Sequence, residues 1–549
     1  MLPLQIWGGI ECSVVRVGRS TRNQLRETGH LRRPDDIRLL AGLGLRTVRY
    51  PVLWELIEAR RGHPDWRWTD ERLAQLREEG VSPIATLLHH GAGPSWTDLL
   101  DPQFPEKLAA FAGTVAHRYP WISSYTPVNE PLTTARFCGL YGHWHPHERD
   151  ETACLRITMN ECRGVALAMR AIRNVNPHAK LVQTEDFGRI SATPEMQDQA
   201  DYENERRWLS IDLLTGRVTP EHAFHQRLLD AGVPAARLAD LVAHPCPPDI
   251  IGIDYYLTSD RVLDHRLVRH PNEPVGGNGR QSYVDIAAVR SDLPQKRRGL
   301  SQRLLEIWNR YRIPIAITEL HNGCSRDEHL RWLIDGWKDA QAARALGADV
   351  RAVTSWSLFG SRDWNSLMTR RDGHYECGAF DIRSTPPRPT IVARAISDLA
   401  RHGRFDHPVL DGAGWWHGDT AILQTARPLV LLGRSPLTDE IADCCASRRL
   451  RTLGAGKHED IEGLFLHARA WAVVSAETDR ENRDQTTVIC TFPDGTCIRL
   501  KQPSRDFNIH AMLDEIIDRS VDHLFISKLP EEGNWNKALS RAQQTGEAY

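Results

Sequence analysis

The chain has 549 residues, which is longer than one domain usually needs, so we expect more than one domain. Apolar residues make up 41% and charged residues 26%, a balance typical of a globular protein with a large core. The net charge of −2 excludes strong electrostatic attraction to nucleic acid or to a membrane surface, and no apolar run is long enough to span a membrane.

The N-terminus and the cysteines both favour a cytoplasmic protein. The segment Met1–Trp7 lacks a basic stretch followed by a long apolar one, so we predict no secretory signal. The 11 Cys residues are scattered, without a paired framework or the CxxC spacing of zinc sites, which indicates reduced thiols. The adjacent Cys444 and Cys445 are interpreted as small apolar side chains of a helix rather than as a redox pair.

Short apolar runs alternate with amphipathic stretches over the first 400 residues, the pattern of repeated βα units. Apolar residues at three- and four-residue spacing predict helices at Asp35–Leu43, Trp68–Glu79, Pro105–Arg118 and Met159–Asn174. Eight strands are predicted, at Gln5–Cys12, Thr47–Pro51, Ser82–Leu88, Ser123–Val128, Lys180–Glu185, Ile250–Tyr256, Ile313–Thr318 and Ala352–Leu358. Eight such units in order favour an α/β fold with a closed (β/α)₈ TIM barrel over an open sheet.

The remaining segments predict insertions and a second domain. Ser191–Pro248 and Ser259–Gly299 are expected to be insertions that shape the cleft, and the second contains the tight-turning segment Gly276–Gly279. We predict a barrel over residues 1–402, a linker over 403–426 and a small α/β domain over 427–549. Its predicted elements are strands Pro428–Gly433, Ala470–Ser475 and Asp522–Ser527 and helices Ile441–Arg448 and Met512–Ile517.

Two phrases place a carboxylate at the end of an apolar, strand-like run: Thr126–Pro131 contains Glu130, and Ile317–Glu319 ends on Glu319. They follow the fourth and seventh predicted strands, and the chemistry of barrels lies at the carboxyl ends of strands. A single Glu in such a place is commonly structural. Two facing carboxylates, one protonated and one ionised, are the minimal machinery for breaking a glycosidic bond.

From Trp7 to about Ala400 the chain resembles glycoside hydrolase family 1, a family of retaining β-glycosidases with a barrel fold. Thr126–Pro131 is similar to the T-x-N-E-P motif of this family. The resemblance implies that Glu130 is the general acid/base and that Asn129 contacts the sugar hydroxyl beside the reacting carbon. Ile317–Glu319 is similar to the nucleophile motif and implies that role for Glu319.

Further segments extend the resemblance to sugar-binding residues. Thr86–His89 resembles the segment whose His binds sugar hydroxyls, and Arg49 matches the Arg placed against the nucleophile. Ile253-Asp254-Tyr255-Tyr256 is similar to an I-N-Y-Y phrase, which implies that Tyr256 is the partner of the nucleophile. As alternatives, Arg49 is an ordinary barrel ion pair, His89 and His90 are satisfied polar residues near the core, and Tyr255 is a core residue.

The segment Trp356–Trp364 is similar to the family signature W-S-L-x-D-x-x-E-W. The resemblance implies that Trp356 forms a platform for the sugar and that Asp363 and Trp364 contact its outer hydroxyls. Asp363 is one carbon shorter than the Glu of the signature, and its alternative interpretation is a solvated turn residue.

Several departures concern the sugar-binding residues rather than the carboxyl pair. The Y-Q-x-E-G phrase of the first strand is absent, and Glu11 is either a partial substitute for its Gln or a structural ion pair. The segment after the nucleophile is Leu320–Gly323, His90 replaces a Trp, and Gly360 replaces an Asp. These changes put ordinary glucosidase or galactosidase specificity in question and permit a repurposed activity.

The segment Gly142–His147 has three alternating His residues, but no carboxylate or Cys accompanies them at a diagnostic interval. A metal site is therefore one alternative, beside a polar substrate-facing loop or a structural turn, and we predict no metal. His321 and Cys324 follow Glu319 closely and are candidates to line the aglycone side.

The segment from about Pro428 to Lys528 resembles a degenerate Rossmann-like unit of the dTDP-4-dehydrorhamnose reductase type. Phosphate binding in such units needs a Gly-rich turn before the first helix. Here Pro436 removes a backbone donor and Asp439 places negative charge near the helix start, so we predict no NAD(P) and no other cofactor. A structural, docking or dimerisation role is expected, and the domain is a candidate surface for homo-oligomer formation.

Together these features predict a retaining glycoside hydrolase that cleaves a β-glycosidic bond of a small glycoside or glycoconjugate by double displacement. The expected partner is a small carbohydrate, with no nucleic acid and no membrane. One alternative is a biosynthetic enzyme that uses the same carboxyl pair for proton transfer, elimination or transglycosylation. Another is a sugar-binding or scaffold protein without enzymatic activity.

Overall fold

The computed structural model describes residues 2–293, 299–418, 424–478, 485–503 and 507–523. The chain divides into two compact units. The first consists of residues 1–322, 335–388 and 399–403, and the second of residues 323–334, 389–398 and the chain from 404 onward. No helix within the described ranges is both long and apolar enough to cross a membrane.

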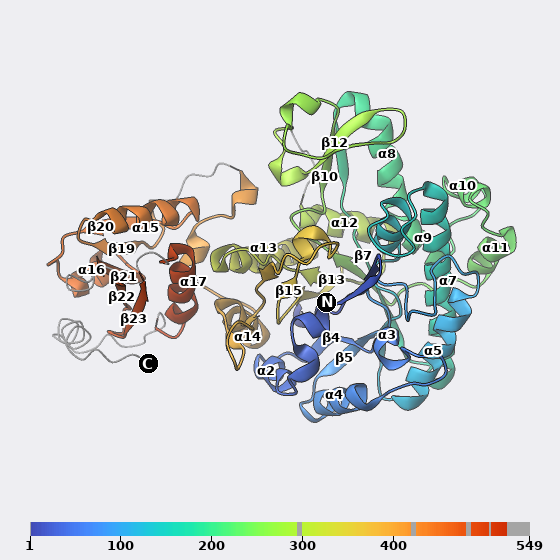
Figure 1. Cartoon of the computed structure of the whole chain (residues 1–549), viewed down its shortest axis with the longest axis horizontal. Helices are drawn as coiled ribbons and strands as arrows, with labels where there is room; N and C mark the ends of the chain where they lie inside the picture. Colours follow the sequence, from blue (N-terminus) through green and yellow to red (C-terminus); the bar gives the residue numbers. More distant parts are fainter. Residues whose placement is uncertain (1, 294–298, 419–423, 479–484, 504–506, 524–549) are drawn as a thin grey trace. The chain divides into compact units, whose positions relative to one another are not determined.

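Eight parallel strands close into a barrel in the first unit, in the order β1-β14-β13-β9-β7-β6-β5-β4 (Figure 1). The predicted (β/α)₈ TIM barrel is therefore confirmed. The strands are β1 (Gln5–Gly9), β4 (Thr47–Pro51), β5 (Ser82–Thr86), β6 (Ser124–Thr126), β7 (Lys180–Glu185), β9 (Ile250–Asp254), β13 (Ile315–Leu320) and β14 (Val350–Ser355).

The barrel strands are buried because helices cover their outer face. β13 is buried at every residue, as expected for a parallel strand that is covered on both sides. Side chains from five strands fill one part of the interior: Trp7, Ile84, Val182, Ala316 and Ala352. β6 is shorter than the predicted Ser123–Val128, and beyond it Asn129 pairs with His89 through one isolated bridge. This bridge brings two predicted site residues side by side.

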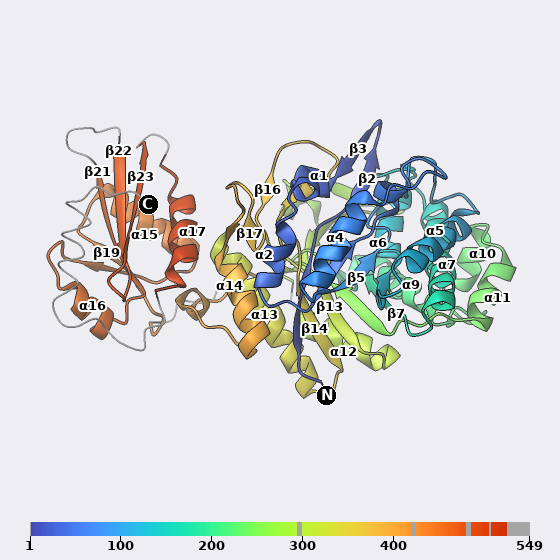
Figure 2. The ribbon, with the colours of Figure 1, turned by 90° about the horizontal axis from the view of Figure 1, so that it is seen from below.

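Helices α4, α5 and α7 lie outside the barrel strands (Figure 2). α7 begins at Glu151 rather than at the predicted Met159, because the Asp150 carboxylate caps it by accepting a hydrogen bond from the Ala153 amide at 2.8 Å. The longer helices are α2 (Asp36–Gly42), α4 (Arg67–Glu78), α5 (Phe104–Arg118), α7 (Glu151–Val175), α12 (Leu300–Tyr311), α13 (Arg326–Ala345) and α14 (Ile391–His402). Shorter helices are α1 (Gln24–Glu27), α3 (Trp54–Ile57) and α6 (Pro131–Ala135).

The predicted insertions contain regular structure that their composition did not indicate. A four-stranded sheet of order β11-β12-β10-β8 joins the two insertions, and it lies with α8 at one end of the unit (Figure 1). Its strands are β8 (Ile190–Ala192), β10 (Arg261–Asp264), β11 (Val275–Gly277) and β12 (Ser282–Ala287), and its helices are α8 (Gln197–Arg206), α9 (Leu209–Leu214), α10 (His225–Asp230) and α11 (Ala235–Ala243). The remaining strands form three two-stranded sheets: β2 (Val14–Val17) with β3 (Ser20–Asn23), β15 (Ser361–Arg362) with β16 (Tyr375–Glu376), and β17 (Phe380–Asp381) with β18 (Arg388–Pro389).

The second unit contains a five-stranded sheet of order β20-β19-β21-β22-β23. β19 pairs in parallel with β20 and β21, whereas β22 and β23 continue the sheet in antiparallel orientation. Its elements are β19 (Leu429–Leu432), α15 (Pro436–Ser447), β20 (Thr452–Ala455), α16 (Ile461–His467), β21 (Ala472–Thr478), β22 (Gln485–Thr491), β23 (Cys497–Pro503) and α17 (Ile509–Ser520).

The two strands predicted at 428–433 and 470–475 and the two predicted helices are present, while β20, β22 and β23 were missed. Of the predicted strand Asp522–Ser527, residues 522–523 form a turn and residues 524–527 lie outside the described residues. The Rossmann-like interpretation and the resemblance to reductases stay predictions.

Candidate active site

The two predicted catalytic carboxyls lie at the same end of the barrel. Glu319 is near the end of β13, and Glu130 follows β6 as the residue before α6. Both are buried, with 2% and 5% of their surface exposed. The negative charge of Glu319 is one of the causes that raise the pKa of Glu130, so the two groups interact electrostatically.

Glu319 has a cation and a hydroxyl donor. Arg49 donates from Nη1 to Oε1 of Glu319 at 2.8 Å, and the Tyr256 hydroxyl donates to Oε2 at 2.5 Å. Burial raises the pKa of the Glu319 carboxyl and Asp254 adds to this rise, while Arg49 and the Tyr256 hydrogen bond lower it. These two partners favour the ionised form, because each stabilises negative charge on the carboxylate.

Among the described residues, no Lys or Arg lies within 4 Å of the Glu130 carboxylate. Burial raises its pKa well above the usual range, and the charges of Asp254 and Glu319 raise it further. The nearest basic group is His90, whose Nε2 is 3.3 Å from Oε2 of Glu130 and whose own pKa burial lowers to about 3. Glu130 also has a left-handed backbone, with φ of +44°. Non-glycine residues seldom adopt this conformation, and such strain gathers at functional sites.

The hydrogen-bond network around Asn129 fixes the orientation of its amide and the tautomer of His90. The amide oxygen of Asn129 accepts from Arg49 Nη2 at 2.5 Å and from the Thr184 hydroxyl at 2.7 Å, so its NH₂ group points to His90 Nε2 at 3.3 Å. The Thr134 hydroxyl donates to the Asn129 backbone carbonyl and therefore accepts from Nδ1 of His90 at 3.2 Å. His90 Nε2 consequently carries its single lone pair, which accepts from the Asn129 NH₂ group and also faces Oε2 of Glu130 at 3.3 Å.

His89 offers unused hydrogen-bonding capacity. Its ring stacks on Trp356 with a centroid distance of 5.2 Å and an interplanar angle of 16°. Both ring nitrogens are buried and have no hydrogen-bond partner among the described residues. Burial lowers the pKa of His89 well below its usual range, so the ring is neutral and has one donor and one acceptor. A buried polar group without a partner is costly, so a ligand hydroxyl is a natural complement.

A family model described as glycosyl hydrolase family 1 matches residues 22–379, more than half of the chain. The chain belongs to glycosyl hydrolase family 1. Solved structures with the same fold include a family 1 β-glucosidase from Thermotoga maritima, with 16% identity, a TM-score of 0.56, and coverage of 74% of this chain and 99% of that one. The same enzyme in complex with deoxynojirimycin matches with 16% identity, a TM-score of 0.57, and coverage of 73% and 98%. At this identity the likeness to solved structures concerns the fold.

Glu11 lies where the family pattern has its first-strand phrase. Its Oε1 accepts from the Ser13 amide at 2.9 Å and from the Ser13 hydroxyl at 2.5 Å. Its Oε2 accepts from Trp356 Nε1 at 3.2 Å, and Arg49 lies over the same indole at 4.5 Å. Burial raises the pKa of Glu11. Glu11 therefore contacts the predicted sugar platform, and sugar binding by Glu11 stays a prediction.

Asp363 is turned toward the protein rather than left free for a ligand. Its Oδ2 accepts from Arg22 Nη2 at 2.7 Å and its Oδ1 accepts from the His374 amide at 2.8 Å. The alternative of a solvated turn residue is wrong, because Asp363 is buried. A direct contact of Asp363 with a sugar hydroxyl stays a prediction, and both of its oxygens already have donors. Trp364 is half-buried, and its ring meets His90 edge-on at 5.6 Å.

Sequence reasoning gave little weight to three groups beside these residues: His90, Asp254 and Trp144. No role was predicted for Asp254, although it stands where the similar I-N-Y-Y phrase has Asn. Trp144, within the His-containing loop, contacts both His90 and Trp364, with centroid distances of 5.5 and 6.0 Å. The presence of Asp in place of Asn could have drawn attention to Asp254. No local sequence pattern indicated that Trp144 lies beside the site.

Two His side chains of the segment Gly142–His147 contact other protein groups. His145 Nε2 lies 3.0 Å from Asp98, and His147 Nε2 accepts from the Gly18 amide at 3.1 Å. Within the described ranges, no group of three or more His, Cys, Asp or Glu side chains is arranged to hold a metal ion. Tyr255 is buried and its hydroxyl donates to Asp260 at 3.1 Å.

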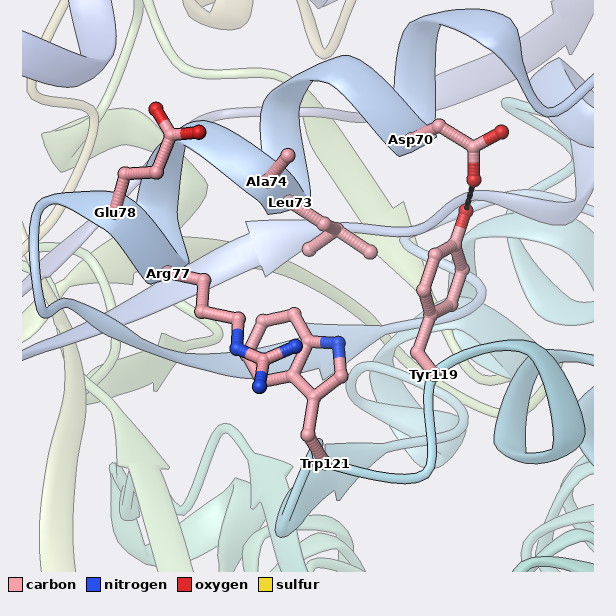
Figure 3. A pocket seen from close by; sticks show the side chains of 7 residues that line it. All are labelled: Asp70, Leu73, Ala74, Arg77, Glu78, Tyr119 and Trp121. Carbon is pink, nitrogen blue, oxygen red and sulfur yellow. Dashed lines mark hydrogen bonds between the residues drawn. The ribbon is translucent and has the colours of Figure 1, made fainter.

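A cavity of about 420 Å³ opens elsewhere, between α4 and the segment after α5 (Figure 3). Three of the polar side chains that line it have partners: the Tyr119 hydroxyl donates to Asp70 at 2.8 Å, and Arg77 lies over the Trp121 ring at 5.6 Å. It is formed by the outer helices rather than by strand ends. We therefore assign the candidate active site to the carboxyl pair.

Proposed function

We propose that this family 1 chain is a retaining β-glycosidase that hydrolyses a small glycoside or glycoconjugate by double displacement. The observation that carries the proposal is the unequal environment of the two carboxyls. Glu319 has Arg49 and Tyr256 as partners, whereas Glu130 has the lone pair of a neutral His90. A retaining enzyme needs one ionised nucleophile and one protonated acid, and this arrangement supplies that difference.

In the first step Glu319 attacks the anomeric carbon and forms a covalent ester with the sugar. The bond to the leaving oxygen breaks, and Glu130 gives its proton to that oxygen. Arg49 keeps Glu319 ionised before the attack. Because Arg49 also donates to the Thr318 carbonyl at 2.9 Å, its guanidinium stays fixed at the end of β13.

In the second step Glu130, now ionised, removes a proton from water. The resulting hydroxide attacks the anomeric carbon, breaks the ester and releases the sugar with its original configuration, so that Glu319 becomes ionised and Glu130 protonated again. Asn129 and His89 are proposed to bind the sugar hydroxyls and Trp356 to form its platform. These roles are supported by the contacts of Asn129 with Arg49 and of His89 with Trp356.

The test is hydrolysis of aryl β-glycosides by the purified chain and by the variants Glu319→Gln and Glu130→Gln. Glu319→Gln should lower kcat/KM by several orders of magnitude for every substrate. Glu130→Gln should lower it by about 10²–10⁴-fold for poor leaving groups and much less for activated ones, which need little protonation. The matched control is Glu11→Gln, the same change at a neighbouring carboxyl, with a far smaller loss expected. Normal turnover in both catalytic variants would remove the assignment.

A second candidate function uses the same pair for proton transfer, elimination or transglycosylation in a biosynthetic step. It is favoured by the altered sugar-binding residues, since Glu11 and Asp363 are held by Ser13, Trp356 and Arg22. Inertness toward all simple aryl glycosides, together with transfer of a sugar to an alcohol acceptor, would support this candidate over hydrolysis.

A further inference from the structure

A third carboxyl lies beside the two catalytic ones. Asp254 is at the end of β9 and is completely buried. Its Oδ1 accepts from the Thr318 hydroxyl at 2.6 Å and lies 3.6 Å from Nη1 of Arg49. The family phrase has Asn here, so this chain has exchanged a neutral amide for an ionisable group of nearly the same shape.

The second oxygen of Asp254, Oδ2, is buried and accepts no hydrogen bond from any described N–H or O–H group. A side-chain hydrogen bond from Glu130 is among the influences that lower the pKa of Asp254, which makes Glu130 the donor and Asp254 the acceptor. Two carboxylates cannot hydrogen-bond to each other, so a contact of this kind requires that one of the two is protonated. His90 Nε2, 3.3 Å from Oε2 of Glu130, is an alternative acceptor for the single proton of Glu130, and it shares its lone pair with the Asn129 NH₂ group.

We propose that Asp254 is a positioning residue that shares one proton with Glu130, holds Glu130 in its acid form, and remains the counter-ion of Arg49 after Glu319 has reacted. This inference rests on the proposed roles of Glu130 and Glu319. Asp254 itself does not touch the reacting atoms in this scheme. It acts through its charge and through the shared proton.

The charges of the cluster balance through both steps. At the start Glu130 is neutral, Asp254 and Glu319 each carry −1, and Arg49 carries +1. When the proton moves from Glu130 to the leaving oxygen, Glu319 becomes a neutral ester and Glu130 carries −1, so the net charge is unchanged. Arg49 then keeps Asp254 as its anionic neighbour, and the close approach of two carboxylates favours the return of a proton from water to Glu130.

Several other charged groups surround this pair. Burial raises the pKa of Asp254 to about 6, opposed by Arg49 and the Thr318 hydroxyl, while Asp186 raises it further. The neighbours that face Glu130 or Asp254 are Arg49 on β4, His90 after β5, Glu185 and Asp186 at the end of β7, and Glu319 on β13. Among the carboxyls that raise the pKa of Glu130, Asp186 has the smallest influence, and its Oδ1 accepts from the Gly188 amide at 2.8 Å.

The test is Asp254→Asn, which removes the charge and keeps the shape. Loss of a nearby negative charge lowers the pKa of Glu130, so the basic limb of the kcat/KM profile should move to lower pH by about 1–2 units. His90→Phe removes the acceptor of the protonated form and should give a smaller shift in the same direction. Asp186→Asn, the control for general electrostatics, should shift the limb least. An unchanged basic limb in a folded Asp254→Asn variant overturns the proposal.

A second measurement does not depend on turnover. The infrared band of the protonated Glu130 carboxyl, obtained as the difference between spectra with and without Glu130→Gln, is followed against pH in the parent protein and in the D254N variant. A lower titration midpoint with D254N supports the proposal, and equal midpoints overturn it. If the parent protein turns over no glycoside, the proposed function fails while this titration still decides the role of Asp254. Should D254N not fold, Asp254→Ser, which also removes the charge, provides the same comparison: a lower midpoint supports the shared proton, and an unchanged one overturns it.

Discussion

At the residue scale, Arg22 and Asp363 form a buried ion pair next to the predicted sugar-binding residues. Arg22 donates to Asp363 and to Glu27, and its side chain is 2% exposed. Asp363 has a left-handed φ of +57°, and its carboxylate lies against both Arg22 and the His374 amide. Removal of one partner from a buried ion pair leaves a desolvated charge, which is strongly destabilising.

We predict that Asp363→Asn lowers the free energy of unfolding by about 3 kcal/mol, with part of the Arg22 charge still balanced by Glu27. KM for the glycosides that Asp363→Asn still hydrolyses should change little. Denaturant unfolding and steady-state kinetics measure the two effects. Asp372→Asn, at the exposed pair with Arg370, is the matched control and should cost less than about 0.5 kcal/mol. A large rise in KM with no loss of stability would instead indicate a sugar-binding role.

The resemblance to the family sufficed to predict two of the side chains that contact Glu319. Arg49 and Tyr256 contact Glu319 as the resemblance implied, because their strands have a fixed order in the barrel. The partners of Glu11 and Asp363 could not be predicted, since both depend on backbone geometry at loops far apart in the chain. The importance of His90 could not be predicted either, because its tautomer depends on hydrogen bonds with Asn129 and Thr134 that only the structure shows.

At the element scale, the indole of Trp356, which directly follows β14, packs closely against Gly9 of β1. A Cβ atom on Gly9 would lie 2.2 Å from Cε3 of this indole, closer than atoms can approach. β1 pairs with β14 in parallel, and the Leu358 amide donates to the Gly9 carbonyl at 3.0 Å. The glycine therefore permits the indole to lie against the strand.

We predict that Gly9→Ala displaces Trp356, lowers the free energy of unfolding by about 1–3 kcal/mol, and lowers kcat/KM. Thermal unfolding and aryl glycoside kinetics measure this. Gly42→Ala is the control, because nothing lies within 4 Å of the added carbon at the end of α2, and no loss of stability is expected there. Unchanged stability and activity in Gly9→Ala would show that the indole is not constrained by the strand.

The eight barrel strands were predictable because buried parallel strands are continuous apolar runs with regular spacing. The insertion sheet β11-β12-β10-β8 was not, because its strands are short and β11 is the exposed segment Val275–Gly277. Its strands also come from two separate insertions. How strands from distant segments pair with each other cannot be read from the local sequence. The strands β22 and β23 were missed for a different reason, since polar residues interrupt their apolar pattern.

At the scale of the whole molecule, the described residues of the candidate site belong to the first unit. The two carboxyls proposed to be catalytic, Arg49, His89 and Trp356 all lie within it. In the second unit the Ser435 side chain caps α15 in a capping box with Thr438. The polar side chains of the segment after β19 therefore bind backbone groups at the start of this helix. The absence of NAD(P), a docking role and homo-oligomer formation through this unit stay predictions.

We propose that strands distant in the sequence bring Glu130 and Glu319 to one sugar, with Glu319 as the nucleophile. The most direct measurement is mass spectrometry of the protein after incubation with an activated 2-deoxy-2-fluoro β-glycoside, which slows hydrolysis of the covalent intermediate. We predict one added sugar per chain, located on the peptide that contains Glu319 and absent from Glu319→Gln. An adduct on another residue, or turnover of glycosides without any adduct on Glu319, would contradict this assignment.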